Sequence, residues 1–194
     1  MKFEIYKFNK VTSTNDIAID LIRKKKKLSG YIYADTQTKG RGSRGRKWIS
    51  KTGNLFSSLF FSLKENYPGF HEFSIINPII VSNVIKNFCD IKKINFKFPN
   101  DILINKKKVC GLLQETITFN DKKFLIVGIG INIISNPDIR NKYKATNIFS
   151  ETNVKINISE IIKLLITSYE DFLANINRYN YANYKKKVDL MAIK

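Results

Sequence analysis

The segment from Gly40 to Trp48 holds the residue types best suited to bind a phosphate or carboxylate ligand. Three of the chain's six arginines (Arg41, Arg44, Arg46) lie within it, although most of the 34 basic residues are lysine. A guanidinium group can hold two oxygens of one phosphate, and glycine lets the backbone approach a ligand closely. The Gly-Lys-Ser/Thr sequence that closes a P-loop is missing. Composition alone therefore leaves open a nucleotide-binding loop, a basic surface loop and a nucleic-acid-binding segment.

Other polar residues could act on the same ligand, but each also has an ordinary structural explanation. The segment from Lys97 to Asp101 offers an ammonium group and a carboxylate, and carboxylates bind Mg²⁺. Its last two residues are equally typical of a turn after proline. Lys108 lies in a run of three lysines, which is typical of a solvated turn. Ser13 and Thr14 are typical of a helix N-cap.

The elements that would position these residues mix strands and helices without a regular repeat. Period-two alternation predicts a strand at 3–8, and helical spacing predicts a helix after Thr14 that ends at Gly30. Further strands are predicted at 31–34, 55–63, 96–98, 102–104, 109–119 and 124–134. Further helices are predicted through 76–88, from a cap at Ser159 through 172, and at 179–187. This order predicts a single α+β domain, 1–194, with a mixed sheet flanked by helices.

Composition excludes several other classes of function. A single histidine, His71, and two distant cysteines, Cys89 and Cys110, exclude a histidine-rich or cysteine-rich metal centre. The longest apolar run, 124–134, is shorter than the roughly 18 residues that span a bilayer, and the N-terminus has no apolar signal core. We therefore expect a cytoplasmic protein without membrane contact. The net charge of +18 predicts attraction to anions, but lysines are spread along the whole chain.

Five blocks of sequence, in order and spacing, resemble the biotin protein ligases. They are Ser13-Thr14-Asn15, Gln37 through Trp48, Lys97 through Asp101, Lys108 through Gly111, and Gly128 through Asn132. Each block alone is common, but together they span the catalytic core of that family. The resemblance implies the fold of class II aminoacyl-tRNA synthetases and biotin ligases. It also implies formation of biotinyl-5′-AMP from biotin and ATP, followed by transfer of biotin to a lysine of a biotin carboxyl carrier protein, such as that of acetyl-CoA carboxylase.

The resemblance implies roles for individual residues as well. Those expected to bind biotin are Ser13, Thr14, Asn15, Gln37, Arg41, Gly42, Ser43, Lys108 and Gly111. Those expected to bind ATP or the adenylate are Arg44, Arg46, Trp48, Lys97, Asn100, Asp101, Gly130 and Asn132. Lys108, Arg46 and Asp101 are expected to act in catalysis, and Asp101 is also the expected Mg²⁺ ligand and the nearest candidate for a general base. Gly128 and Gly130 are expected to let their strand approach the ligand closely.

The sequence departs from the family's pattern in three places. Ser43 stands where the family usually has an arginine. If that arginine helps to retain the adenylate, the neighbouring Arg44 could take over its role. Phe98 replaces the common tryptophan before Pro99. The chain stops at Lys194, near where a small C-terminal β-barrel usually begins, and its first residue already starts the catalytic core. We therefore expect neither that barrel nor an N-terminal DNA-binding domain, and no operator binding.

Two other functions compete with a biotin ligase. A lipoate protein ligase shares the general fold and the adenylate chemistry, but the dense Gly/Arg loop with Trp48 favours biotin. A basic nucleic-acid-binding protein would show strongly salt-dependent affinity, but the chain carries no recognised aromatic nucleic-acid motif. The resemblance also allows a homodimer in which two chains pair through a sheet edge.

Overall fold

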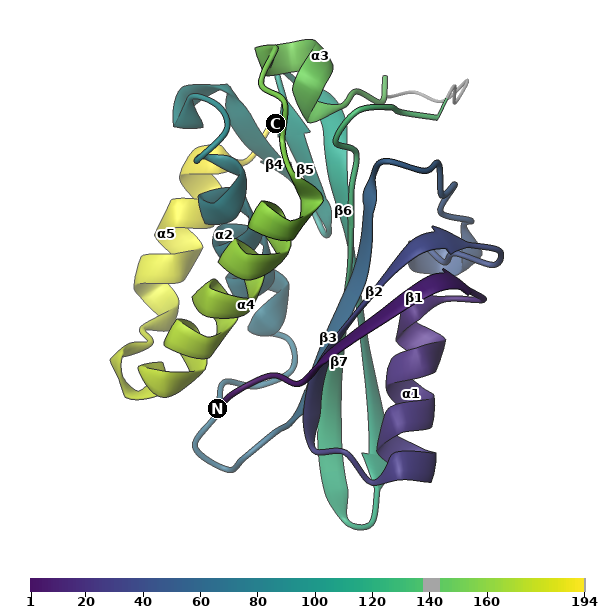
Figure 1. The fold of residues 1–194 in the computed structure, drawn as a ribbon. Helices are drawn as coiled ribbons and strands as arrows, with labels where there is room; N and C mark the ends of the chain where they lie inside the picture. Colours follow the sequence, from purple (N-terminus) through teal and green to yellow (C-terminus); the bar gives the residue numbers. More distant parts are fainter. Residues whose placement is uncertain (138–143, 194) are drawn as a thin grey trace.

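A seven-stranded mixed sheet forms the centre of the molecule, in the order β1-β2-β3-β7-β6-β5-β4 (Figure 1). The computed structural model describes residues 1–137 and 144–193. The strands are β1 (Ile5–Val11), β2 (Ser29–Gln37), β3 (Leu55–Ser62), β4 (Ile94–Lys97), β5 (Asp101–Ile104), β6 (Lys107–Phe119) and β7 (Lys122–Ile131). β1 and β2 are parallel, and the other neighbouring pairs are antiparallel. The predicted α+β fold with a mixed sheet is confirmed.

Helices cover the two faces of the sheet unequally (Figure 1). The longer helices are α1 (Thr14–Lys25), α2 (Phe73–Ile85), α4 (Ile158–Ala174) and α5 (Tyr181–Met191). The short helical segments are η1 (Ser43–Gly45), η2 (Ile91–Lys93), α3 (Ile148–Thr152) and η3 (Ile176–Arg178). On one face, α1 buries Ala18 and Ile22 in a small cluster with Phe60. On the other face, α2, α4 and α5 cover the larger core. Among the described helices, none combines the length and apolar character that crossing a membrane requires.

Continuous apolar runs form the middle of the sheet because both of its faces are covered there. In β3, every residue from Leu55 to Phe61 is buried, and the neighbouring strand β7 is buried from Phe124 to Ile129. A strand that is buried on both sides needs no polar alternation. The serines of β3 are therefore exceptions that need hydrogen-bond partners, and one of them, Ser58, contributes to the site described below.

The start of the chain differs from the prediction at one helix end. The helix after Thr14 is confirmed, but it ends at Lys25, where Lys26 adopts the left-handed conformation (φ 52°). Gly30 instead lies inside β2, where a Cβ atom would approach the ring of Phe60 to 2.7 Å. Glycine is therefore required at this position for strand packing and does not terminate the helix.

In the second half of the chain, the structure differs from the prediction at the start of one helix and contains one short helix that was not predicted. The cap of α4 is Asn157, whose side chain accepts the backbone N–H of Ser159 at 3.0 Å, so the predicted cap at Ser159 is wrong by two residues. The sequence pattern gives no signal for α3, because five residues are too few to show helical periodicity.

Candidate active site

One pocket collects nearly all the residues expected to bind ligand. It lies between the start of α1, the Gly/Arg loop (residues 40–49) and the strands β5, β6 and β7. The predicted residues that line it are Ser13, Thr14, Asn15, Gln37, Arg41, Gly42, Ser43, Arg46, Trp48, Asn100, Asp101, Lys108, Gly111, Gly130 and Asn132. Arg44 and Lys97 are not among the lining residues: Arg44 is exposed in η1, and Lys97 ends β4 opposite Asp101. The fold thus brings all five sequence blocks together.

Gln37 holds the first turn of α1, and this leaves the side chain of Ser13 without a capping role. Ser13 occupies the N-cap position, but its hydroxyl makes no capping hydrogen bond. Instead, Gln37 Oε1 accepts the backbone N–H of Thr14 at 2.9 Å and the Thr14 hydroxyl at 3.3 Å. Gln37 Nε2 donates to Ser50 Oγ at 3.2 Å. A plain helix cap therefore does not explain Ser13, which is 3% exposed and lines the pocket.

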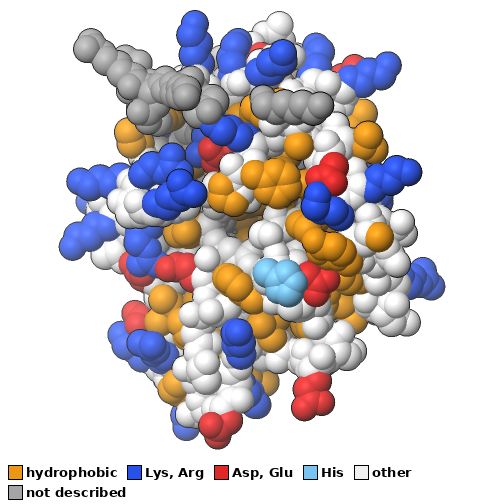
Figure 2. Space-filling model, turned by 180° about the vertical axis from the view of Figure 1, so that it is seen from behind, with side chains coloured by type: hydrophobic (Ala, Val, Ile, Leu, Met, Phe, Trp, Pro, Cys, Tyr) orange, Lys and Arg blue, Asp and Glu red, His pale blue; other side chains and the backbone are white. Residues whose placement is uncertain are grey.

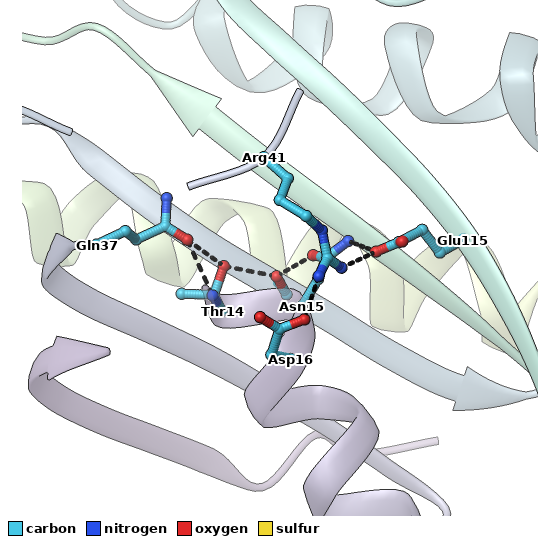
Figure 3. A network of polar contacts seen from close by, with 7 residues as sticks. Thr14, Asn15, Asp16, Gln37, Arg41 and Glu115 are labelled. Carbon is cyan, nitrogen blue, oxygen red and sulfur yellow. Dashed lines mark hydrogen bonds and ion pairs between the residues drawn. The ribbon is translucent and has the colours of Figure 1, made fainter. Parts of the chain in front are cut away.

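Beneath the loop, Arg41 lies between two carboxylates (Figure 3). Its guanidinium donates hydrogen bonds to Asp16 of α1 and, at 2.7 Å, to Glu115 of β6. The same oxygen of Glu115 accepts a hydrogen bond from Asn15 Nδ2 at 2.6 Å, and Asn15 Oδ1 accepts one from the hydroxyl of Ser58. The side-chain groups of Arg41 and Asn15 that are expected to bind biotin are therefore already engaged by the protein.

Three glycines of β6 and β7 make room for neighbouring side chains of the pocket. A Cβ atom at Gly128 would approach Asn15 Oδ1 to 2.6 Å. Gly111 and Gly130 face each other in register, and Cβ atoms there would approach the ring of Trp48 to 2.6 Å and 2.5 Å. The indole ring of Trp48 therefore packs directly against these two facing glycines. Gly128 and Gly130 also line the pocket, so the expectation that they let their strand approach the ligand stays a prediction.

Lys108 differs from the two lysines that precede it. Its Nζ forms an ion pair with Asp101 Oδ1 at 2.6 Å and lies 5.3 Å from the centre of the Trp48 ring. Within the preceding run, Lys107 instead pairs with Glu151 at 2.9 Å. The ion pair places an ammonium group at the pocket and also gives Asp101 a cationic partner, which argues against Asp101 as a free general base.

Two buried polar atoms in the pocket need a partner from outside the protein. Among the described residues that line the pocket, Trp48 Nε1 and Asn132 Oδ1 are buried without a hydrogen-bond partner, and Asp101 Oδ1 has only its ion pair with Lys108. Asn132 Nδ2 donates to the carbonyl of Thr146 at 2.9 Å, which fixes the orientation of its amide. Buried polar groups are normally paired. These atoms therefore favour a ligand that offers an acceptor to the indole N–H and a donor to the amide oxygen.

The Gly/Arg loop closes on itself at its tip. The Gly42 N–H donates to the carbonyl of Arg46 at 2.7 Å, and Arg44 and Gly45 follow each other with positive φ (57° and 72°). The Arg46 guanidinium donates to the carbonyl of Ser43 at 3.2 Å and to its hydroxyl at 3.0 Å. Ser43 therefore folds Arg46 back along the loop at the edge of the pocket.

Several residues of the site are not singled out by the sequence. Glu115 has a recognisable signal, because Gly111, Leu113 and Glu115 alternate along β6 and alternate residues of a strand share a face. Ser58 also has one, because it interrupts the apolar run of β3. Neither of these two lines the pocket itself; the lining residues that the sequence does not single out are Lys47, Ile49, Ser57, Leu112, Leu113, Ile129, Pro137 and Ala145.

The charged groups of the pocket do not form a metal centre by themselves. Within residues 1–137 and 144–193, no group of three or more histidine, cysteine, aspartate or glutamate side chains could hold an ion. Among the described residues that line the pocket, Asp101 is the only one with a carboxylate. Mg²⁺ usually binds one or two carboxylates together with substrate phosphates and water. The donor set therefore fits an ion that arrives with a nucleotide.

Comparison with known proteins agrees with this geometry. Residues 7–132, well over half of the chain, match a family model described as the biotin/lipoate A/B protein ligase family. The bifunctional ligase/repressor BirA of Bacillus subtilis is 30% identical over 165 residues, covering 82% of this chain and 50% of its own. A biotin–[acetyl-CoA-carboxylase] ligase of Paracoccus denitrificans is 26% identical over 160 residues, covering 79% and 67%.

A solved structure extends the match to nearly the whole chain. The biotin protein ligase of Aquifex aeolicus, in complex with biotin and ATP, superposes with a TM-score of 0.80 at 28% identity and covers 98% of this chain and 78% of its own. The chain spans half or less of the length of the bifunctional relatives from Bacillus subtilis and Escherichia coli. The expected resemblance is confirmed, and the chain belongs to the biotin/lipoate A/B protein ligase family.

Proposed function

We propose that this chain is an ATP-dependent biotin protein ligase, which forms biotinyl-5′-AMP and transfers biotin to a lysine of a biotin carboxyl carrier protein. The observation that carries the proposal is the composition of the pocket described above. Within it, the polar groups of the α1 start and the Gly/Arg loop lie beside Trp48, Lys108 and the unpaired amide oxygen of Asn132. The Aquifex aeolicus relative, which binds biotin and ATP, has the same fold.

The pocket divides naturally between the two substrates. At the end formed by the start of α1, Ser13 and Thr14 offer hydroxyl groups, and Leu113 adds an apolar side chain to the pocket lining, which suits a ring system with one polar edge. At the other end, Trp48 offers an aromatic face on which a base can stack, and Asn132 Oδ1 can accept a hydrogen bond from an amino group such as that of adenine. We assign biotin to the first end and the adenylate to the second.

The chemistry requires two anions to react with each other. A carboxylate oxygen of biotin attacks the α-phosphorus of ATP, the bond to the bridging oxygen breaks, and pyrophosphate leaves. Lys108 and Arg46 offset the repulsion, and a donor aimed at developing charge is worth roughly 3–4 kcal/mol. In the second step, the acceptor lysine's neutral amine attacks the acyl carbon, AMP leaves with the bridging oxygen, and the amine proton passes to solvent or to AMP. The ammonium of Lys108 can stabilise the acyl oxygen once its pair with Asp101 opens.

The remaining assignments follow from the same pocket. When bound, Mg²⁺ would neutralise phosphate charge, with Asp101 as its protein ligand and phosphate oxygens as the others. Asn100, whose side chain holds β6 through the carbonyl of Leu112 at 2.7 Å, would keep Asp101 in place. Arg44 and Lys97, which do not line the pocket here, would act only after the loop moves or the nucleotide binds.

The acceptor protein would approach a basic face. In the face shown in Figure 2, lysine and arginine side chains gather along the upper and left margins, while a few acidic and basic side chains lie among the hydrophobic ones nearer the middle. Such a field attracts an acidic partner and speeds its encounter. The proposed place of action is the cytoplasm, where ATP and carrier proteins are available. If the protein forms a homodimer, β1 is the sheet edge that offers unpaired backbone groups.

Biotin-dependent exchange between ATP and pyrophosphate would test the first half-reaction. The purified chain should catalyse exchange with biotin and not with lipoate or without an acid. Exchange with lipoate alone would move the protein to the lipoate branch of its family. No exchange with either acid, in a chain that also fails to bind biotin in a calorimetric titration, would refute the proposal.

A further inference from the structure

Lys108 faces the pocket because β6 contains a β-bulge at this point. Ile102 and Leu103 are consecutive in β5, but their partners in β6, Cys110 and Lys108, are separated by one extra residue, Val109. Side chains alternate between the two faces of a strand, so without the extra residue Lys108 would share the core face of Cys110. A bulge also interrupts the ladder of hydrogen bonds between strands. The direction of the Lys108 side chain therefore depends on what supports this irregular stretch of β6.

The backbone of Lys108 is supported by a segment from later in the chain, which we call the strap (residues 144–148). β7 stops pairing with β6 before it reaches Lys108. In its place, the carbonyl of Lys144 accepts the Lys108 N–H at 3.0 Å, and the Thr146 N–H donates to the Lys108 carbonyl at 2.8 Å. The carbonyl of Thr146 also accepts the side-chain amide of Asn132 at 2.9 Å. Thr146 is therefore shared by two residues of the site.

One carboxylate joins the strap to the turn that precedes Lys108. Glu151 of α3 lies at the end of the sheet where β5 turns into β6 (Figure 1), and its side chain is only 7% exposed. Its Oε1 accepts the Thr146 hydroxyl at 2.6 Å and the Lys107 ammonium at 2.9 Å, and its Oε2 accepts the Asn105 amide at 2.7 Å. Burial raises the pKa of Glu151, but these three hydrogen bonds lower it overall, so the ionised form is favoured.

We propose that Glu151 is a positioning residue for Lys108. By joining the strap to the turn between β5 and β6, it holds the bulged stretch of β6 from both sides and keeps the ammonium group of Lys108 directed at the pocket. Glu151 does not line the pocket, so it acts through Lys108 and not on a substrate. The effect on catalysis rests on the proposed function, because a reacting group displaced by about 1 Å can cost about 100-fold in rate.

Chemical labelling of Lys108 tests the positioning without relying on enzyme activity. In the parent, the Lys108 side chain is 25% exposed and paired with Asp101, which shields the amine from reagents. After Glu151→Gln, labelling of Lys108 by limiting acetic anhydride should rise about threefold or more relative to the exposed Lys10, as measured by mass spectrometry.

A matched variant controls for the lost charge in this labelling experiment. Glu160→Gln removes the same charge from an exposed position in the first turn of α4, and labelling of Lys108 should then stay at the level of the parent. Equal labelling of Lys108 in Glu151→Gln and Glu160→Gln would overturn the proposal.

A double-mutant cycle separates positioning from a general loss of structure. At saturating ATP, Glu151→Gln should lower kcat in biotin-dependent pyrophosphate exchange about tenfold to 100-fold. In the Lys108→Met background the same change should lower kcat less than twofold, because a positioning residue has no effect once the group that it positions is gone. An equal fall in both backgrounds would show a merely structural role and overturn the proposal.

Thr146 offers a second and milder test, which also serves if Glu151→Gln does not fold. Thr146→Val removes only the hydroxyl that Glu151 holds and should lower kcat severalfold, whereas Thr146→Ser keeps the hydroxyl and should stay within twofold of the parent. Equal kcat values for the two variants would contradict the positioning role. Faster labelling of Lys108 after Glu151→Gln, in a protein without biotin-dependent exchange in any form, would support the positioning and refute the proposed function.

Discussion

Replacing Gly130 by alanine should weaken nucleotide binding through the indole ring of Trp48. The added Cβ atom would lie 2.5 Å from the ring, where an ordinary contact begins at 3.4 Å, so the ring must move by about 0.9 Å. Overpacking of this kind typically costs 1–3 kcal/mol. Because the ring belongs to a loop and not to the core, we expect most of that cost to fall on ligand affinity. It corresponds to about a fivefold to 150-fold rise in the dissociation constant for ATP.

Intrinsic fluorescence can measure this effect directly, because Trp48 is the only tryptophan in the chain. ATP would be titrated into the parent and into Gly130→Ala, and the KM for ATP in pyrophosphate exchange would be measured in parallel. Adding Trp48→Phe to Gly130→Ala supplies a smaller ring and should restore part of the affinity. If the dissociation constant of Gly130→Ala for ATP is within twofold of that of the parent, the position of the Trp48 ring against Gly130 does not determine nucleotide affinity.

Three further changes probe other parts of the molecule. Lys108→Met should lower kcat in pyrophosphate exchange by about 100-fold or more, because a donor to developing charge is lost; a fall of less than tenfold would contradict the role given to Lys108. Burial raises the pKa of Glu170, but Lys2 and the Phe3 N–H lower it overall. Its contribution to stability is therefore present above its ordinary pKa of 4.5 and lost as pH falls through the lowered value. In urea unfolding, the free energy of unfolding of Glu170→Gln should fall less steeply at acid pH than that of the parent. An equally steep fall would argue against this role of Glu170. Ser43→Arg should slow release of biotinyl-5′-AMP in a chase experiment, and an equal or faster release would mean that the loop tip does not retain it.

Local patterns in the sequence predict much of the fold. The hairpin of β6 and β7 follows from two long apolar-rich runs joined by Asn120 and Asp121, which both adopt the positive φ (47° and 57°) of a tight hairpin turn. The sequence also predicts where each of the five blocks lies in the fold, because each block stands at the beginning or the end of a helix or strand. Where a helix stops is harder to predict, as Gly30 shows: a glycine marks a helix end and a crowded strand position equally well.

The partners of individual side chains lie beyond such patterns. The bond between Asn15 and Glu115 joins positions 100 residues apart, and the one between Arg41 and Glu115 spans 74. The sequence shows a guanidinium and 16 acidic residues but does not indicate which of them meet. For this reason Arg41 is expected from the sequence to contact the ligand, while the structure engages it with carboxylates.

The strand order has a consequence for the synthesis of the protein. β3 needs β7 as its neighbour, and the hydroxyl of Ser57 donates to the carbonyl of Ile129, which is 72 residues further along the chain. At a synthesis rate of about 5–20 residues per second, β3 leaves the ribosome roughly 4–14 s before its partner. During that interval a strand that is buried along nearly its whole length in the folded protein has one unpaired edge. The growing chain is therefore most prone to aggregate midway through translation, while β3 waits for β7.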